Sequence, residues 1–338
     1  MSTRAGSEGA AAADVERWHR DPASLATLPL GAFDEAPLAQ VMLRRLLLKL
    51  RVPPVLLAPL ARHRALRRTL ESYRYWRGVR RSVDAETWRR LTQGTTILMY
   101  HAFGVGDEPP SRFVVTRSAF AQQMRWLARR RPVIALEELL AHRRSNRLPP
   151  AGSVVVTIDD GYDDVRTVAQ PVLRALGLRA SLFIVTDRMG DANRWDPDGP
   201  LVGRQLMSWD DARQLHREGI GLCAHTQTHP VLPDLPSERV EAEVGGSRDD
   251  VELELGVRAD AFAYPFGRWD ERAAQTVAAA GFACALTDRP GRNCAGTAPY
   301  ALRRVEIRGD DSRLRFLVAM TFGDSRVFCR VLRRLVRR

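Results

Sequence analysis

Short apolar runs rich in β-branched residues alternate with longer helix-like stretches through the middle of the chain. Seven runs are predicted as strands, at 96–100, 154–158, 181–185, 220–224, 261–264, 282–286 and 302–307. The intervening stretches have helical spacing, at 118–130, 165–176, 208–218, 238–255 and 271–280. Gly219 and Gly281 stand where two of these helices end, a place that favours glycine. This alternation predicts an α/β fold in which parallel strands are joined by helical crossovers.

The pattern divides the chain into four parts. We predict a flexible N-terminal segment at 1–38, a basic helical extension at 39–94, an α/β domain at 95–310 and a basic amphipathic C-terminal helix at 311–338. Charged residues of the third part fall where predicted strands end. Barrels of parallel strands carry their active sites at those ends.

The chain has 338 residues and a formal net charge of +12. Lys49 is the only lysine, so the positive charge is almost entirely arginine. An excess this one-sided is partly compositional, and we expect no nucleic-acid partner. Arginine also pairs with phosphate and carboxylate, so an anionic surface remains open as a partner.

The four cysteines form no Cys-x-x-Cys pair and are expected to be buried free thiols, as suits a reducing compartment. The first residues, Met1 to Val15, lack the apolar region of a secretory signal. No run of 18 apolar residues suits a spanning helix. We therefore expect a cytoplasmic protein, peripheral at the inner membrane surface if it contacts lipid.

The first chemical motif is the run Val154 to Ile158 followed by Asp159, Asp160 and Gly161. Adjacent carboxylates in one site repel each other, so a cation beside one leaves the other available as a base. Asp163 and Asp164 follow, and these two are equally explained as the N-terminal cap of the next helix.

The second motif, His225-Thr226-Gln227-Thr228-His229, follows another strand-like run. A spacing of four places two imidazoles on one side of a helical turn, which Pro230 would end. Two histidines and one carboxylate, with an open position for water, form a catalytic zinc set. Two unrelated loop histidines are the alternative, and the Asp-Asp strand end in the same region argues against it.

The third motif is the segment 262–267, Phe-Ala-Tyr-Pro-Phe-Gly, which is predicted to be a strand followed by a turn. Its aromatic rings are explained equally well as a wall on which a sugar stacks or as core residues.

The three motifs in this order resemble the polysaccharide deacetylase family, also called the NodB homology or carbohydrate esterase 4 family. The resemblance covers roughly residues 96–307, and the run Leu98-Met99-Tyr100-His101 is similar to the opening strand of one branch. It implies a distorted (β/α)7 barrel, a bound divalent metal and hydrolysis of an N-acyl amino sugar in a polysaccharide or lipid-linked saccharide.

The resemblance also implies residue roles. Asp159 matches the catalytic base, and the metal ligands are matched by Asp160, His225 and His229. Tyr264, Pro265 and Phe266 match the groove motif, in which the backbone N–H after the proline, here that of Phe266, helps to hold the oxyanion.

Two features depart from the family pattern. The arginine that usually stands two residues before the groove proline is replaced by Ala263, and no histidine follows His229 to supply the late general acid. Among the remaining histidines, His101 alone ends a strand on the expected active face. We therefore assign His101 as the acid or as an orienting group.

The flanks of the barrel mix apolar and basic residues. The extension at 39–94 and the tail, whose residues 327, 328, 331, 332, 335 and 336 form an apolar stripe among arginines, are typical of helices that lie on anionic membranes. Packing on the barrel, with the arginines solvated, remains the alternative.

Two functional classes follow. The first is a metal-dependent N-deacetylase, with Zn²⁺ as the expected ion. The second is a saccharide-binding or scaffold protein that retains the barrel but not turnover, and the two departures above are what favours it.

Overall fold

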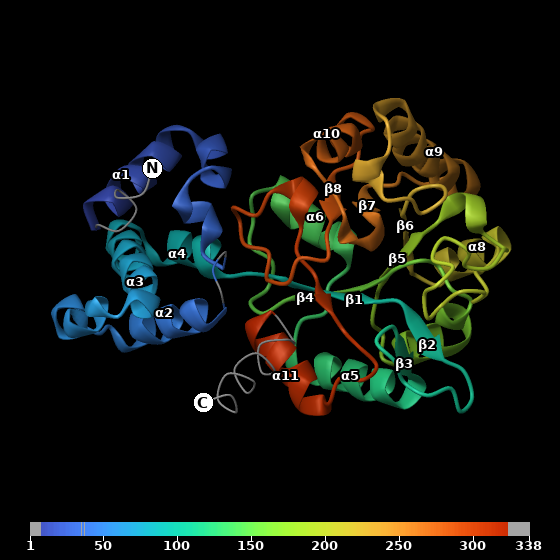
Figure 1. Cartoon of the computed structure of the whole chain (residues 1–338), viewed down its shortest axis with the longest axis horizontal. Coiled ribbons are helices and arrows are strands. Elements are labelled where there is room, and N and C mark those ends of the chain that lie inside the picture. Colours follow the sequence, from blue (N-terminus) through green and yellow to red (C-terminus); the bar gives the residue numbers. More distant parts are fainter. Residues whose placement is uncertain (1–7, 35, 37, 324–338) are drawn as a thin grey trace. The chain divides into compact units, whose positions relative to one another are not determined.

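The computed structural model describes residues 8–34, 36 and 38–323, which fall into two units. One is a helical unit made of the described residues up to Gly94 together with Asn293–Ala298. The other, an α/β unit, contains Thr95–Arg292 and continues from Pro299 (Figure 1). Each unit is described here by itself.

The α/β unit is built on a seven-stranded sheet. Its strands are β1 (Thr96–Tyr100), β4 (Val154–Ile158), β5 (Ser181–Ile184), β6 (Gly221–Ala224), β7 (Ala261–Ala263), β8 (Cys284–Leu286) and β9 (Val305–Glu306). Their spatial order is β8-β7-β6-β5-β4-β1-β9, and every neighbouring pair is parallel. An isolated parallel bridge from Leu286 to Leu302 links β8 to the segment before β9. The seven predicted strands are therefore confirmed as one parallel, barrel-like sheet.

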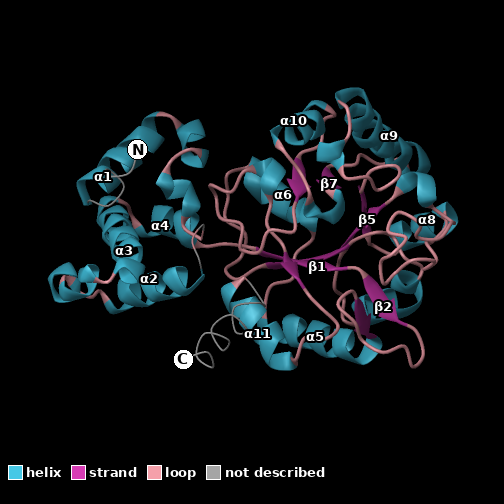
Figure 2. Cartoon of the chain, in the orientation of Figure 1, coloured by secondary structure: helices cyan, strands magenta, loops and turns pink. Residues whose placement is uncertain are grey.

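Helices surround this sheet, as Figure 2 shows in cyan around magenta strands. They are α5 (Arg117–Arg130), α6 (Leu136–Arg144), the π-helical turn Val165–Ala169 leading into α7 (Gln170–Ala175), α8 (Trp209–Arg217), α9 (Ser237–Leu255), α10 (Glu271–Ala279) and α11 (Arg313–Phe322). Short 3₁₀ turns cover Thr186–Arg188, Leu232–Asp234, Pro265–Gly267 and Pro299–Ala301.

Local sequence explains several of these boundaries. Ser208 and Asp211 form a capping box at the start of α8, and Asp270 caps α10 by accepting from the N–H of Ala273. Gly219 and Gly281 follow the ends of these two helices at φ of 93° and 91°, in the left-handed region where glycine is favoured. Both predicted helix ends are confirmed.

The core of the α/β unit lies where strands and helices face each other. All five residues of β1 and of β4 are buried, because helices pack on the outer face of the barrel-like sheet and side chains from neighbouring strands fill its inner face. An additional two-stranded parallel ladder, β2 (Ala102–Gly104) with β3 (Val114–Thr116), follows β1 and was not predicted. These strands have only three residues each, too few to show a pattern of alternation.

The helical unit contains α1 (Glu8–Arg20), α2 (Leu38–Leu50), α3 (Arg64–Ser82) and α4 (Ala85–Thr92), with 3₁₀ turns at Pro22–Ala26, Pro29–Ala32, Pro54–Leu57 and Pro59–Arg62. Helix α3 packs against both α1 and α2. Gly78 allows the close approach to α1, because a Cβ there would lie 2.8 Å from the Cβ of Ala11.

The expectation of a flexible segment at 1–38 is wrong for its described residues. Helix α1 buries Ala11, Val15 and Trp18, one helical face that the surrounding alanines concealed in the sequence. Glu8 also pairs with Arg77 at 2.7 Å and with Arg81 at 2.8 Å on α3. Residues 1–7 lie outside the described residues.

The predicted C-terminal helix at 311–338 is described only as far as residue 323. That part contains α11, whose Phe316, Ala319 and Met320 are buried in the main core of the α/β unit. The Phe316 ring lies edge-on to Trp126 of α5 at 5.7 Å. The apolar stripe predicted at 327–336 lies outside the described residues.

The cysteines Cys223, Cys284 and Cys294 are buried free thiols, as expected, and Cys329 lies outside the described residues. Among the described residues, no helix combines the length and apolarity that crossing a membrane requires.

Candidate active site

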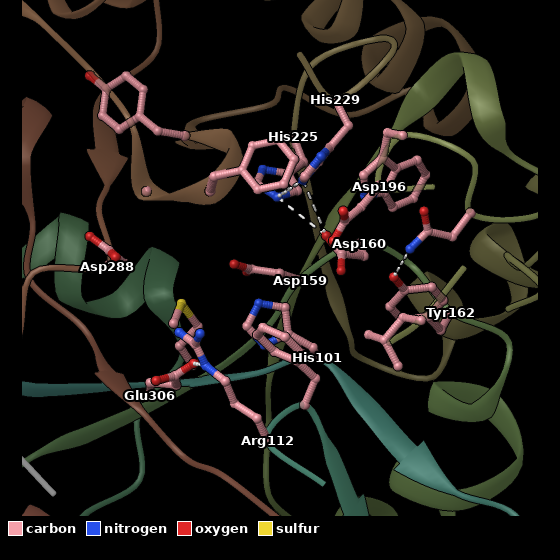
Figure 3. A pocket seen from close by; sticks show the side chains of 18 of the residues that line it. His101, Arg112, Asp159, Asp160, Tyr162, Asp196, His225, His229, Asp288 and Glu306 are labelled. Atoms are coloured by element: carbon pink, nitrogen blue, oxygen red, sulfur yellow. Dashed lines mark hydrogen bonds and ion pairs between the residues drawn. The ribbon is translucent and has the colours of Figure 1, made fainter. Parts of the chain in front are cut away.

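A cavity of about 300 Å³ opens at the carboxyl ends of the central strands. Asp159 and Asp160 follow β4, while His225 and His229 follow β6, and all four side chains line the cavity. Figure 3 shows the two histidines and Asp160 directed at one another, with Asp159 beside them. Parallel strands bring these two distant segments together because their carboxyl ends lie at one edge of the sheet.

Asp160, His225 and His229 offer one ligand atom each, and these atoms lie within 4.8 Å of one another. Asp160 Oδ1 is 3.5 Å from Nε2 of both histidines, and the two Nε2 atoms are 3.2 Å apart. All three residues are buried. Two imidazole nitrogens at this distance repel each other if both carry a proton, whereas both can donate a lone pair to one cation.

The pKa shifts of Asp160 and His229 suit a bound cation. Burial raises the pKa of Asp160, but hydrogen bonds from His225 and His229 outweigh it and hold that pKa well below its usual range. Burial is also the main reason why the pKa of His229 is lowered, with the charge of His225 adding to it. A charged carboxylate with a neutral imidazole is the form in which these groups bind a metal.

Contacts behind the ligands orient them. His225 Nδ1 lies 2.7 Å from the carbonyl of Ala263, to which it can donate, and this leaves Nε2 facing the cavity. His229 Nδ1 is buried without a hydrogen-bond partner among the described residues. The donor set therefore fits a divalent metal, and Zn²⁺ suits two nitrogens and one oxygen.

The predicted helical turn between the histidines is wrong. Residues 225–229 form a loop, with Thr226 and His229 in the left-handed region at φ of 67° and 64°. These two backbone reversals direct both imidazoles to one point. Asp160 and Phe266, at φ of 75° and 56°, share this conformation. Four of the six described non-glycine residues with positive φ thus belong to the site, as is common where strain serves function.

A buried carboxylate that the sequence reasoning missed holds this loop. Glu243 on α9 accepts from the N–H groups of Gln227 and Thr228 at 3.0 and 2.9 Å, and from the Thr228 hydroxyl at 2.6 Å. It is only 2% exposed. The sequence signal that could have identified Glu243 is an acidic residue on the inward face of the predicted helix 238–255.

Arg304 is the second residue that the sequence reasoning missed. Its Nη1 donates to Asp159 Oδ1 at 2.6 Å, and its Nε donates to the carbonyl of Thr287 at 3.0 Å. The pair is almost fully enclosed, with Arg304 1% and Asp159 2% exposed. Thus an arginine next to β9 contacts the expected base, although Ala263 replaces the arginine sought in the groove motif. The sequence signal that could have identified Arg304 is a charged residue within the predicted strand 302–307.

His101 follows β1 and lines the same cavity, as predicted. Its ring lies edge-on to Phe113 at 5.1 Å, and Figure 3 shows it next to Asp159. Asp163 and Asp164 do not line the cavity. Asp164 instead accepts from the N–H of Phe103 at 2.9 Å and from Arg204 at 2.6 Å, a structural role.

The aromatic residues of the third motif divide between core and cavity. Tyr264 is fully buried, stacks on Trp269 at 5.8 Å and donates its hydroxyl to the carbonyl of Tyr300. Tyr264 also lines the cavity, so its assignment to the substrate groove stays a prediction. Phe266, 44% exposed, lies 4.6 Å from the His229 ring.

Other residues complete the wall. Trp195, which the sequence reasoning missed, lies 4.7 Å from the His229 ring. Burial raises the pKa of Tyr162, whose hydroxyl accepts from Asn193 at 2.7 Å. Buried Pro265 lines no part of the cavity but fixes the turn that presents the backbone of Phe266.

Comparison with known proteins gives the following matches. Residues 146–285 match the polysaccharide deacetylase family model. The Bacillus subtilis protein YxkH, whose name assigns it to that family, is 24% identical over 227 residues, or 66% of this chain and 76% of that protein.

Solved structures agree with the fold. The Streptococcus pyogenes deacetylase PplD, determined with acetate, matches with a TM-score of 0.58 at 24% identity, over 67% of this chain and 98% of that one. IcaB from Ammonifex degensii matches with a TM-score of 0.59 at 22% identity, over 68% of this chain and 97% of that one. The predicted distorted (β/α)7 barrel is confirmed.

Proposed function

We propose that the chain is a metal-dependent hydrolase that removes N-acetyl groups from amino sugars of a saccharide, because residues 146–285 match the polysaccharide deacetylase family model. The observation that carries this proposal is one cavity in which three metal-binding side chains adjoin a carboxylate held by a buried arginine. The reaction adds water across an amide bond and yields acetate and a free amine.

Asp160, His225 and His229 would hold the ion, for which Zn²⁺ is our proposal. A bound ion of this kind polarises an acyl carbonyl and makes a water molecule more acidic. The remaining steps belong to side chains and backbone of the chain itself.

Asp159 is the proposed general base, which removes a proton from the attacking water. Arg304 donates to one of its carboxylate oxygens at 2.6 Å. That contact fixes the orientation of the carboxylate and leaves the other oxygen for the water. Arg304 is thus proposed as a positioning residue. From the residue just before β9 it orients the base, which Ala263, in the place of the family's usual arginine, cannot do.

The negative charge that develops on the acyl oxygen needs a donor. The backbone N–H of Phe266 is proposed to stabilise this oxyanion, because the buried Pro265 and the left-handed backbone of Phe266 fix its direction. His101, on the same cavity wall, is proposed to protonate the leaving nitrogen as the C–N bond breaks.

A saccharide suits the walls of this cavity. Trp195 and the exposed ring of Phe266 flank His229 and offer apolar faces to a sugar ring. Asp196, Asp288 and Glu306 add hydrogen-bond acceptors for hydroxyl groups. The proposal covers both a polysaccharide and a lipid-linked saccharide as substrate.

The alternative, a saccharide-binding protein without turnover, rested on the missing arginine and the missing late histidine. Arg304 and His101 occupy the cavity where those groups would act, which supports an active enzyme. Only turnover separates the two functions.

The test combines metal content with acetate release from N-acetylglucosamine oligomers. Wild-type protein is expected to contain about one divalent ion per chain and to release acetate, whereas His229→Ala is expected to lose both. His142→Ala, a change at a partly exposed histidine of α6, is the matched control. Equal metal content in His229→Ala and wild type would remove His229 from the ligands, and full metal without turnover on any N-acetylated saccharide would favour the binding protein.

A further inference from the structure

The helical unit carries a concentration of exposed apolar side chains that its own core does not need. Ten large hydrophobic residues are exposed among the described residues, and five of them lie between positions 42 and 56. Their exposed fractions are 37% for Met42, 51% for Leu46, 63% for Leu50, 74% for Val55 and 67% for Leu56. We call these five residues the apolar tip. Isolated exposed apolar residues are ordinary, but a cluster marks an interaction surface.

Helix α2 presents two apolar faces. Leu47 is buried with Leu70 and Tyr73 of α3, and Leu43 packs against that cluster. Met42, Leu46 and Leu50 repeat every fourth residue and form a separate, exposed stripe. The 3₁₀ turn that follows α2 adds Val55 and Leu56. Because one face already satisfies the packing of α2, the second face is available for a partner.

The stretch of sequence that contains the apolar tip is strongly cationic. From Ala36 to Leu70 the sequence contains no Asp or Glu but eight Arg or Lys residues. Arg44 is buried, Arg45 pairs with Asp34 at 2.8 Å and Arg67 pairs with Glu71 at 3.0 Å. Among the described side chains, no acidic partner pairs with the exposed cations Lys49, Arg51, Arg62 and Arg68.

Lys49 and Arg51 directly flank Leu50, so positive charge borders the apolar tip on both sides of that residue. Long basic side chains can lie along an apolar surface and keep their charged ends in water or at phosphate groups. An apolar insertion edged by Lys and Arg is the arrangement that binds anionic bilayers.

We propose that the apolar tip inserts into the surface of an anionic lipid bilayer, with Lys49 and Arg51 contacting lipid phosphates. A second copy of the chain fits this face poorly, because it would bring unpaired cations against one another. Nucleic acid matches the charge but not the exposed Val55 and Leu56, since phosphate contacts require no apolar insertion. The inference concerns the helical unit and stands whether or not the α/β unit proves to be an enzyme.

Vesicle sedimentation of the full-length protein tests this proposal. The wild type is expected to bind vesicles that contain phosphatidylglycerol, to bind phosphatidylcholine vesicles weakly and to dissociate as salt rises. Leu50→Ser/Leu56→Ser is expected to lower the apparent affinity about tenfold or more, because two inserting side chains are lost. Leu253→Ser/Leu314→Ser is the matched control, since those leucines of the α/β unit are 83% and 54% exposed. This control should bind like the wild type.

A charge variant gives an independent measurement. Lys49→Gln/Arg51→Gln is expected to weaken binding to the anionic vesicles and to reduce its dependence on salt. All these positions are exposed, so the variants should fold, and an unchanged circular dichroism spectrum and unfolding transition check this.

Several results would overturn the proposal. It is wrong if the wild type ignores anionic vesicles at low salt, or if Leu50→Ser/Leu56→Ser binds as well as its control. If removal of residues 324–338 by itself abolishes binding, the contact belongs to the C-terminal segment. A dimer in light scattering that dissociates on Leu50→Ser/Leu56→Ser would assign this face to a second copy. Tight binding of duplex DNA that needs Lys49 and Arg51 but not the leucines would assign it to nucleic acid.

Discussion

Among the described residues, two arginines are almost completely buried, one in each unit, and their surroundings differ. Arg304 of the α/β unit is 1% exposed and forms an ion pair with the carboxylate of Asp159. Arg44 of the helical unit is 2% exposed and forms no ion pair with any carboxylate among the described residues. It donates instead to the hydroxyl of Ser72 at 2.7 Å and to the carbonyl of Phe33.

Aromatic rings surround the guanidinium of Arg44. It lies 4.6 Å from the centre of the Phe33 ring and 5.6 Å from that of Trp76. Burial lowers the pKa of Arg44 to about 10, although the charge of Asp34 opposes the change. The group therefore remains charged at neutral pH, stabilised by hydrogen-bonding dipoles, ring faces and the nearby charge of Asp34.

The difference indicates that the buried charge of Arg304 organises the site, whereas the buried charge of Arg44 only joins helices. A charge balanced by one specific carboxylate fixes the orientation of that carboxylate, and the loss of either partner leaves the other unpaired in a dry interior. A charge held mainly by neutral groups leaves no unpaired ion behind when it is removed, because Asp34 keeps its ion pair with Arg45. Arg304 should therefore matter for activity and stability together, and Arg44 for local packing alone.

The largest expected effect comes from Asp159→Asn, which turns the surroundings of Arg304 into neutral ones like those of Arg44. Loss of the general base should lower acetate release by about 1000-fold, while the metal stays bound. Asp163→Asn is the control, because Asp163 pairs with Arg166 outside the cavity and its replacement should leave turnover near normal. Near-normal turnover of Asp159→Asn would show that another group is the base.

Arg304→Met is expected to lower the free energy of unfolding by about 3–5 kcal/mol, because Asp159 would remain buried without its partner. Turnover should fall as well, since the carboxylate loses its fixed orientation. The same substitution in the Asp159→Asn background should cost clearly less, because no unpaired charge then remains. Urea unfolding of the four proteins measures this coupling, and additive effects would contradict a specific pair.

Glu243→Gln tests whether a second buried charge, that of Glu243, also orients residues of the site. The variant keeps its size but loses the charged acceptor of two backbone N–H groups in the loop that carries both histidines. Affinity for Zn²⁺ is expected to fall by about 10- to 100-fold, as measured by competition with a chelator. Glu241→Gln, at an exposed position of the same helix, should bind Zn²⁺ normally.

The smallest effect is expected for Arg44→Met, the same substitution as at Arg304. It removes a buried charge without stranding an opposite one, so the free energy of unfolding should change by less than about 2 kcal/mol in either direction. Acetate release should be unchanged. A loss as large as that of Arg304→Met would mean that an ion pair is not the property that separates the two arginines.

The sequence by itself determined the strands and the residues of the candidate metal site. The run Val154 to Ile158 is almost entirely apolar and predicts a buried strand. The residues after it must then lie at the carboxyl end of that strand, which is where Asp159 and Asp160 are found. The same argument places His101 after β1 and His225 after β6. These inferences succeeded because strand alternation and parallel topology are local patterns with one spatial outcome.

Tertiary structure alone decided which distant residues complete the site. Arg304 lies 145 positions from Asp159 and Glu243 lies 16 from Gln227, and no local pattern specifies either contact. The left-handed conformations of Thr226 and His229 replaced the expected helical turn because Glu243 and the Thr226 hydroxyl bind the loop amides. In the helical unit, the small residues that made 8–20 look flexible are the ones that let α1 approach α3 at Gly78. Spacing along the chain fixes which elements form, whereas the partners of their side chains depend on packing between elements far apart in sequence.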